Sequence, residues 1–443
     1  MLAVALHAPG HTSVDSTIQL HEAISGRITS WAPPFMSALL YWLGLGSIAT
    51  SLFVALNAAA TYGAMRLAIG AAPGAWPAWR WVLGLAVVAN PVVFAYVGIV
   101  WKDVLLASLC ALSLGLCVGA WRGAGALRAV LAALALAVLL PIPLVRQQGW
   151  AMLPVFAISP VFLIVEAGWR TRRARWLAGL LAVLAIPVGY LAVRAAVEAS
   201  FERNADGSIH AAVGDDVSVG TRLIKLYDLA GIEARVGEGP FARDGASAAQ
   251  LAALDRAYTP TRIDTLGGPV IDPMLAPLHG DGERLDRMWR DAIGAHPGAY
   301  AAHRWDAFAW LVGFNGPDGC LPVHVGVDGI PDYLAESGLK AEMDARDHRL
   351  FHVLRTWIAT PLWRHWFYVA IGLVLAVAIW RRGRSARWAL LPWVAGLAAF
   401  TAGFLPTSIA CDFRYLYTLV PCAGVLALAL LRPAVDRSDV PTA

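Results

Sequence analysis

The chain has 443 residues, of which 58% are hydrophobic and only 15% are charged, and its formal net charge is +4. Its mean hydropathy is +0.58. A soluble protein of this length is excluded, because the charged residues are clustered and leave long apolar runs between them. The arginines separate these runs instead of forming a basic face, so we do not expect nucleic acid as a partner.

Two apolar stretches near the start of the chain are too short to cross a membrane. Residues 1–10 lack the basic start and the cleavage signature of a signal peptide. We interpret them as the tail of a first helix whose beginning is missing from this chain. Residues 35–45 follow Pro33 and Pro34, and we expect them to dip into the membrane or to lie at its surface.

The longer apolar runs are sufficient to cross about 30 Å of hydrocarbon at roughly 20 residues each. The sequence predicts an all-α polytopic membrane protein with about nine to ten transmembrane helices. The expected spans are 47–69, 79–98, 103–121, 127–145, 150–167, 177–197, 362–380, 388–406 and 413–431. Tryptophans at the ends of these runs suit anchoring at the membrane interface. They are Trp79, Trp81, Trp101, Trp121, Trp150, Trp169, Trp176, Trp380 and Trp388.

Arginine divides the connecting loops into two alternating sets. Arginine-rich loops follow the spans that end near residues 69, 121, 167, 380 and 431, and the Lys/Arg bias of short loops places them in the cytoplasm. The other loops, 11–34, 98–103, 146–149, 198–361 and 407–412, then face outward. We therefore predict a protein of the cytoplasmic (inner) membrane. Its parts are an N-terminal membrane region (1–197), an extracytoplasmic domain (198–361), C-terminal membrane helices (362–432) and a cytoplasmic tail (433–443).

The outward insert 198–361 is predicted to be mostly helical. Residues 284–295 and 298–314 form two expected helices broken at Pro297, which fits the first turn of the second helix. The second helix carries Tyr300, Trp305, Phe308, Trp310 and Leu311. Either it lies along the membrane surface or it packs within a small domain on the spans.

The five cysteines fall into two groups. Cys110, Cys117 and Cys422 lie within spans, where cysteine behaves as a small hydrophobic residue. Cys320 and Cys411 are both expected on the oxidising side, where a disulfide between them would tie the insert to the last loop. No cysteine or histidine spacing is typical of a zinc site. The scattered histidines are expected at surfaces or interfaces: His11, His21, His303, His352 and His365.

The first outward loop contains Asp15. A carboxylate between the membrane face and a short re-entrant segment is partly shielded from water, which raises its pKa and suits a general base. The alternative is structural, because aspartate is favoured at helix N-caps and Glu22 would serve the same helix.

Three further outward turns carry ionisable or amide side chains. Lys102 and Asp103 either anchor and cap the next span or together hold a phosphate and its counter-ion. Arg146, followed by Gln147 and Gln148, opposes the arginine bias of the other outward turns, and binding a lipid phosphate would explain it. Arg414 lies one residue inside an apolar span, between Asp412 and Tyr415. It marks a functional site or forms a structural pair with Asp412.

Taken in order, these motifs resemble the GT-C superfamily of membrane glycosyltransferases, which use polyprenyl-phosphate-linked sugars. The resemblance covers most of 11–431 through short motifs. They are the acidic first loop with Asp15, Ala32-Pro33-Pro34 with a short helix ending at Gly46-Ser47, Val100-Trp101-Lys102-Asp103, Arg146-Gln147-Gln148-Gly149 and Asp412-Phe413-Arg414-Tyr415. It implies that Asp15 is the catalytic base and that Lys102, Arg146 and Arg414 bind the lipid phosphate. The second outward turn offers one carboxylate, Asp103, in place of an acidic pair, so no cofactor is certain and a divalent metal remains an open possibility.

The resemblance implies transfer of a sugar, with inversion, from a polyprenyl-phosphate donor to a hydroxyl of a lipid, glycan or protein acceptor outside the membrane. Asp103, Gln147, Gln148, Asp412, Tyr415 and Glu22 are expected to support the site. A transporter or flippase of a lipid-linked or anionic solute is the alternative, since cations at membrane depth suit it too. A third reading is a non-catalytic assembly subunit in which the polar clusters are structural.

Overall fold

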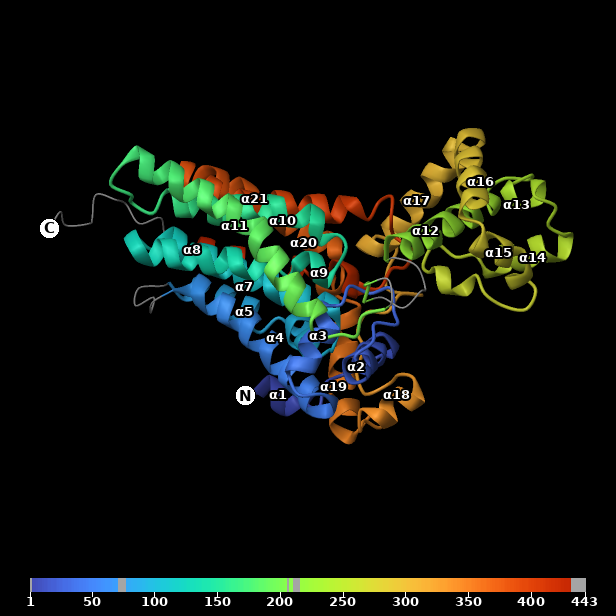
Figure 1. Ribbon diagram of the computed structural model, residues 1–443, viewed down its shortest axis with the longest axis horizontal. Coiled ribbons are helices and arrows are strands. Elements are labelled where there is room, and N and C mark those ends of the chain that lie inside the picture. The colour runs from blue at the N-terminus through green and yellow to red at the C-terminus, as the bar shows by residue number, and fades with distance from the viewer. Residues whose placement is uncertain (1, 71–76, 205–206, 210–215, 432–443) are drawn as a thin grey trace.

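The computed structural model describes residues 2–70, 77–204, 207–209 and 216–431, and within these ranges its regular structure is helical. Backbone pairing between extended segments is limited there to isolated bridges. Figure 1 shows an elongated bundle of long helices with a group of shorter helices at one end. The all-α class predicted from the sequence is confirmed.

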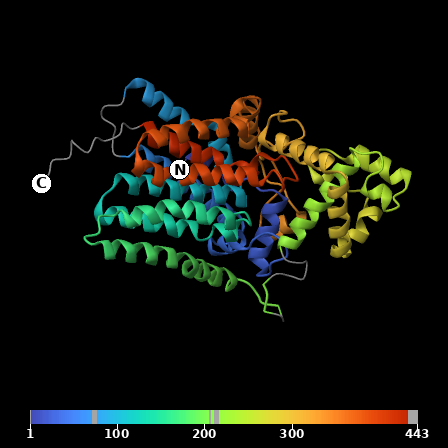
Figure 2. The ribbon, with the colours of Figure 1, turned by 90° about the horizontal axis from the view of Figure 1, so that it is seen from above.

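The bundle contains helices from both halves of the chain. They are α4 (Gly46–Ile69), α5 (Ala78–Val88), α6 (Pro91–Val97), α7 (Lys102–Arg122), α8 (Gly125–Leu139), α9 (Ile142–Val145), α10 (Gly149–Val165), α11 (Arg172–Glu198), α20 (His365–Arg381), α21 (Arg384–Gly403) and α22 (Leu419–Leu431), with the short helix η3 (Phe413–Leu416) before α22. Figure 2 shows α11 along one edge of this bundle.

Six helical segments of the described chain are long and apolar enough to cross a membrane. They are Gly46–Ile69, Ala78–Val97, Lys102–Arg122, Gly125–Val145, Arg172–Glu198 and Phe413–Leu431. Gly149–Val165 and His365–Arg381 are apolar but shorter. These lengths and compositions are those of a membrane protein. The finer expectation of nine to ten crossings stays a prediction.

Helix α7 forms the centre of the bundle and packs closely against α4. Its Gly115 faces Ala64, and a Cβ atom on Gly115 would lie only 2.6 Å from the Cα of Ala64. Small residues let two membrane helices approach closely, so a larger side chain at either position would push α4 and α7 apart. This packing holds α7, whose first residues are Lys102 and Asp103, against α4.

Arginine side chains cap helix ends at one end of the bundle. Arg122 donates from Nη2 to the carbonyl oxygen of Ala429 at 2.8 Å, and Arg128 donates from Nη1 to that of Glu166 at 2.8 Å. Such contacts satisfy the last carbonyls of a helix and suit its dipole. In Figure 1 these helix ends lie away from the group of shorter helices, so the arginine-rich loops and the insert occupy opposite ends.

The start of the chain forms three short helices beside the bundle. They are α1 (Leu2–His7), α2 (Val14–Ser25) and α3 (Phe35–Trp42). The predicted short segment at 35–45 is thus an eight-residue helix, which cannot cross a membrane.

The insert 198–361 is helical in its described part. Its elements are α12 (Asp216–Glu233), α13 (Pro240–Arg243), α14 (Ala248–Ala257), η1 (Ile263–Thr265), α15 (Asp272–Gly280), α16 (Gly282–Ala295), α17 (Pro297–Val312), α18 (Pro331–Glu336), α19 (Ala345–Ile358) and η2 (Pro361–Trp363). The break at Pro297 is where the sequence predicted it, with the proline at the start of α17. Helices α12–α17 enclose an apolar core of their own.

Helix α17 packs on α12 through a buried charged cluster. The Arg304 Nε atom lies 2.6 Å from Asp228 Oδ1, and Trp289 donates from its indole nitrogen to Asp228 Oδ2 at 2.8 Å. Arg304 also donates to the carbonyl oxygen of Ser408 at 2.9 Å, in the loop after α21. One face of α17 is therefore buried in a domain, whereas Trp305 is exposed.

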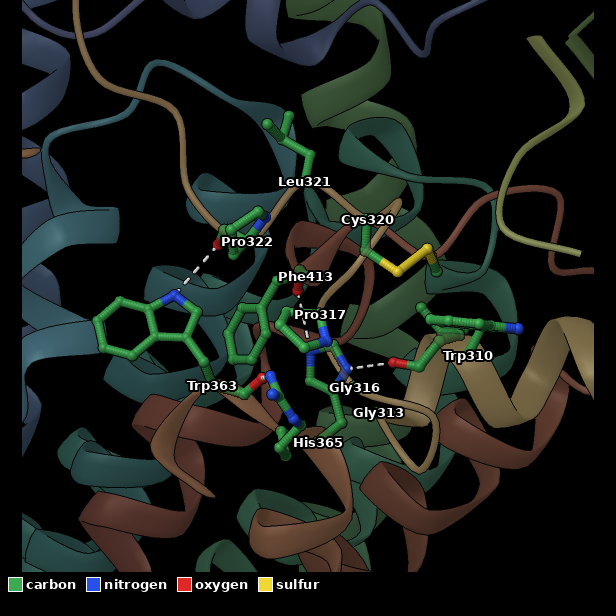
Figure 3. A pocket seen from close by; sticks show the side chains of 13 residues that line it. Trp310, Gly313, Gly316, Pro317, Cys320, Leu321, Pro322, Trp363, His365 and Phe413 are labelled. Carbon is green, nitrogen blue, oxygen red and sulfur yellow. Dashed lines mark hydrogen bonds between the residues drawn. A yellow bond between two sulfur atoms is a disulfide. The ribbon is translucent and has the colours of Figure 1, made fainter. Parts of the chain in front are cut away.

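The insert is bonded to the loop that leads into η3 by hydrogen bonds and a disulfide. The backbone nitrogen of Cys411 donates to Thr261 at 2.9 Å, and that of Phe413 donates to Leu321 at 3.0 Å. Cys320 and Cys411 form the predicted disulfide, with Cα atoms 5.2 Å apart. Figure 3 shows this disulfide at the edge of a small pocket. Cys411 and Phe413 are thus anchored to the insert at the start of η3, next to Arg414.

Candidate functional site

Asp15 is positioned by pairing between the first loop and the turn before α7. The backbone nitrogen of His11 donates to Gly98 and that of Val100 donates to His11, both at 2.9 Å. Trp101 then donates from its indole nitrogen to Ser13 Oγ at 2.8 Å. These contacts bring the first turn of α2 beside the first turn of α7.

The N-cap of α2 is Ser13, so Asp15 is not the cap that the structural alternative required. Asp15 lies in the first turn, where a carboxylate also complements the helix dipole. Half of its side-chain surface is exposed. Its position leaves the carboxylate available for contacts beyond its own helix.

Arg414 and Asp15, 399 residues apart, form an ion pair between Arg414 Nη1 and Asp15 Oδ2. The Nε atom of Arg414 lies 3.4 Å from Asp412 Oδ2, so the expected Asp412–Arg414 pair is also present. The Arg414 guanidinium carbon is 4.9 Å from the centre of the Trp101 ring and 5.3 Å from that of Tyr415. The guanidinium is therefore held by two carboxylates and contacts two aromatic rings.

The charge environment of Asp15 differs from the one expected. Burial by itself raises the pKa of Asp15, but the charge and hydrogen bond of Arg414, together with the charge of Lys102, lower it below its ordinary value of 3.8. The prediction of a raised pKa is wrong, because it considered only the shielding of Asp15 from water and not an ion pair with Arg414. Asp15 is ionised at neutral pH.

Lys102 is the first residue of α7 and lies close enough to Asp15 to influence its charge. Its Nζ atom is 5.1 Å from the centre of the Trp31 ring, in the turn before α3. Lys102 and Asp103 diverge, since Asp103 is directed into the protein and is buried. The expectation that these two neighbours jointly hold a phosphate and its counter-ion is not met by this geometry.

Asp103 pairs with Arg146, and both side chains are almost fully buried. The Nε atom of Arg146 donates to Gln148 Oε1 at 2.9 Å. The Arg146 guanidinium also lies 5.1 Å from the Tyr415 ring centre and 5.5 Å from that of Phe404. Tyr415 is thus in contact with both Arg146 and Arg414, and the four predicted turns meet in one region.

The remaining supporting residues have structural contacts. Glu22 is fully buried and accepts hydrogen bonds from the backbone nitrogens of Thr29 and Ser30, at 2.9 and 2.6 Å, and from Ser37 Oγ at 2.7 Å. It therefore orders the turn before α3 instead of capping α2. The Nε2 atom of Gln147 is buried and finds no partner within the described part of the chain.

An apolar cavity of about 200 Å³ lies between α20, α21 and α22. Its walls include Tyr368, Leu397, Thr401, Leu419 and Ala423, with Phe308 of α17 at its margin. Thr401 lies one turn before Phe404, whose ring is 6.1 Å from that of Tyr415. Helix α21 thus continues from the wall of the cavity to the aromatic side chains that surround the two arginines.

A second, much smaller pocket of about 20 Å³ lies beside the disulfide (Figure 3). The two ring nitrogens of His365 lie 2.7 Å from the carbonyl oxygen of Leu311 and 2.9 Å from that of Phe413. The ring also stacks on Phe413 at 4.2 Å. This pocket contains none of the charged residues predicted for the site, and its contacts brace the backbone next to Arg414.

Among the described residues, no group of three or more histidine, cysteine, aspartate or glutamate side chains is arranged to hold a metal ion. His11, His303 and His365, expected at surfaces or interfaces, are buried, and each has polar partners inside the protein. The free cysteines Cys110, Cys117 and Cys422 are buried, as expected for small apolar residues.

Three aromatic residues of the site were not identified from the sequence. Trp101 was interpreted as an interfacial anchor, but it is buried and lies over Arg414. Trp31 and Phe404 contact Lys102 and Arg146. Only Trp101 had a usable signal, since it directly precedes Lys102 in an outward turn.

Comparisons with protein-family models, with curated proteins and with solved structures found no match to this chain.

Proposed function

We propose that this protein is an integral membrane glycosyltransferase that moves a sugar from a polyprenyl-phosphate donor to an acceptor hydroxyl outside the cytoplasm. The observation that carries the proposal is the meeting of Asp15, Lys102 and Arg414 at the end of the bundle opposite the arginine-rich loops. It brings together the two kinds of group that the transfer needs, a carboxylate to accept a proton and cations to stabilise a leaving phosphate.

The donor would bind with its phosphate at Arg414 and Lys102 and its prenyl chain in the cavity between α20, α21 and α22. The apolar walls of that cavity suit a hydrocarbon chain, and Thr401 in its wall lies one turn before Phe404, whose ring contacts Arg146. Arg146 would not bind the phosphate directly, because its donors already face Asp103 and Gln148. It would instead hold Tyr415 in place.

Asp15 would accept the proton of the acceptor hydroxyl while the hydroxyl oxygen attacks the anomeric carbon from the side opposite the phosphate. The bond between that carbon and the phosphate oxygen breaks, and polyprenyl phosphate leaves with the bonding electron pair. Arg414 and Lys102 would stabilise the charge that develops on the leaving phosphate. The sugar is transferred with inversion at its anomeric carbon.

Replacing Asp15 by Asn tests this proposal because Asn has nearly the same shape but cannot accept the proton. The experiment supplies a panel of polyprenyl-phosphate hexoses and pentoses, labelled in the sugar, to membranes that contain either protein. We expect Asp15→Asn to reduce transfer by at least about a hundredfold, in line with loss of a general base. Asp264→Asn, in η1 of the insert, is a matched control with the same chemical change.

Wild-type turnover by Asp15→Asn would overturn the catalytic role. Absence of transfer from every donor by the wild type, together with uptake of a lipid-linked solute into sealed vesicles, would favour a transporter instead.

A further inference from the structure

The proposed site requires the Arg414 guanidinium for two different contacts. Arg414 is paired with Asp15, yet the donor phosphate would need the same cation. An aspartate paired with arginine is also a weak base, because the ion pair stabilises its carboxylate. The arrangement without donor therefore suits neither phosphate binding nor proton transfer.

We propose that the donor phosphate displaces Asp15 from Arg414, so that phosphate binding itself releases the base for the acceptor. This inference rests on the proposed function. It adds an order to the reaction: the carboxylate becomes a competent base only after the donor is in place.

The contacts of Arg414 allow one partner to be exchanged while the others remain. Asp412 faces Nε, whereas Asp15 contacts the terminal Nη1 atom. Asp412 directly follows the disulfide cysteine Cys411, and the next residue, Phe413, is hydrogen-bonded to the insert. Asp15 has half of its side-chain surface exposed. The guanidinium can therefore keep Asp412 and its two aromatic neighbours while Nη1 turns to a phosphate oxygen.

Arg146 provides the contrast within the same site. Its pair with Asp103 is almost completely shielded from water, and its Nε donates to Gln148. Separating a buried pair leaves an uncompensated charge, whereas a partly exposed pair contributes little net free energy. A phosphate ester accepts charge-assisted hydrogen bonds from arginine with good geometry. The exchange is accordingly expected at Arg414 and not at Arg146.

After its release, the Asp15 carboxylate would lie near charged and titratable groups from several elements. Lys102 and Arg414 face Asp15, and the phenol of Tyr415 also influences it. Asp412, Arg146 and His324 influence Arg414 from the other elements around it. Loss of the Arg414 contact and arrival of a phosphate anion both favour the protonated form of Asp15. Its proton affinity therefore rises when the donor binds.

Binding of sugar-free polyprenyl phosphate to the purified protein in phosphatidylcholine nanodiscs tests the exchange without requiring transfer. We expect Asp15→Asn to bind the lipid phosphate roughly twofold to fivefold more tightly than the wild type, because no ion pair must be broken first. Asp15→Ser provides a second variant in case the first folds poorly. Asp412→Asn is the matched control and should leave the affinity within about 1.5-fold of the wild type, because Asp412 remains paired throughout.

Removal of the repulsion between Asp15 and the phosphate is an alternative cause of tighter binding. Repeating Asp15→Asn in an Arg414→Gln protein distinguishes this cause from the exchange. Exchange predicts that Asp15→Asn then has a smaller effect, since the pair is already absent, whereas repulsion alone predicts an equal or larger effect. Equal effects in both backgrounds, equal tightening by Asp412→Asn, or no tightening by Asp15→Asn would overturn the exchange and leave the proposed function standing. Failure of the wild type to bind polyprenyl phosphate would overturn both.

Discussion

At the scale of single residues, the sequence identified the ionisable groups but not their pairing. Asp15, Lys102, Arg146 and Arg414 were predicted because each lies in or beside a loop that the sequence predicts to face outward. Which acid meets which cation depends on how four loops pack, and no spacing encodes it. For that reason the Asp103–Arg146 pair and the lowered pKa of Asp15 were not predicted.

The buried pair yields a prediction about stability. Arg146→Ala should lower the free energy of unfolding by about 3 to 5 kcal/mol, because it leaves the Asp103 carboxylate buried without a partner. Thermal unfolding of the purified protein in detergent measures this loss. Replacing both residues by apolar ones of similar volume, Arg146→Met with Asp103→Leu, should restore much of the stability. Unchanged stability in Arg146→Ala, accompanied by weaker donor binding, would show that Arg146 is a phosphate ligand.

At the scale of elements, apolar runs predicted the positions of helices well but missed their breaks. The predicted span 79–98 is divided between α5 and α6 at Asn90, whose side chain accepts a hydrogen bond from Val92 N, with Pro91 at the start of α6. The predicted span 127–145 is similarly divided between α8 and α9 near Pro141. Hydropathy records how long a run is, whereas proline and a capping side chain determine where the helix stops.

The loop before η3 shows how an element can depend on a distant segment. The disulfide from Cys411 to Cys320 closes a loop of 91 residues and lies three residues before Arg414. Cys320→Ser should cost roughly 4 to 5 kcal/mol of stability by the loop-entropy estimate. It should also weaken polyprenyl-phosphate binding, because Arg414 loses an anchor. Thermal unfolding and lipid binding measure the two effects.

Cys117→Ala controls for loss of a thiol, because Cys117 is buried and free. It should retain the lipid affinity of the wild type. Equal affinity in Cys320→Ser and the wild type would show that hydrogen bonds to the insert suffice to hold Arg414.

At the scale of the whole molecule, the division of loops into two sets corresponds to two ends of one bundle. Arginine caps helix ends at one end, and the insert with the Asp15–Arg414 pair occupies the other. The alternation of apolar runs and loops predicted this separation of the loops, because successive spans run in opposite directions. The inner structure of the insert was not predictable to the same degree: its core comes from helices α12–α17, and the sequence predicted the bounds of the last two alone. The predicted cytoplasmic tail, 433–443, lies outside the described residues.

The most direct test of the central claim is an electron cryomicroscopy structure of the protein in nanodiscs with polyprenyl phosphate. The account predicts phosphate density within hydrogen-bonding reach of Arg414 and Lys102, Asp15 separated from Arg414, and the prenyl chain between α20, α21 and α22. Phosphate density at the opposite end, beside the arginines that follow α7 and precede α11, would contradict it.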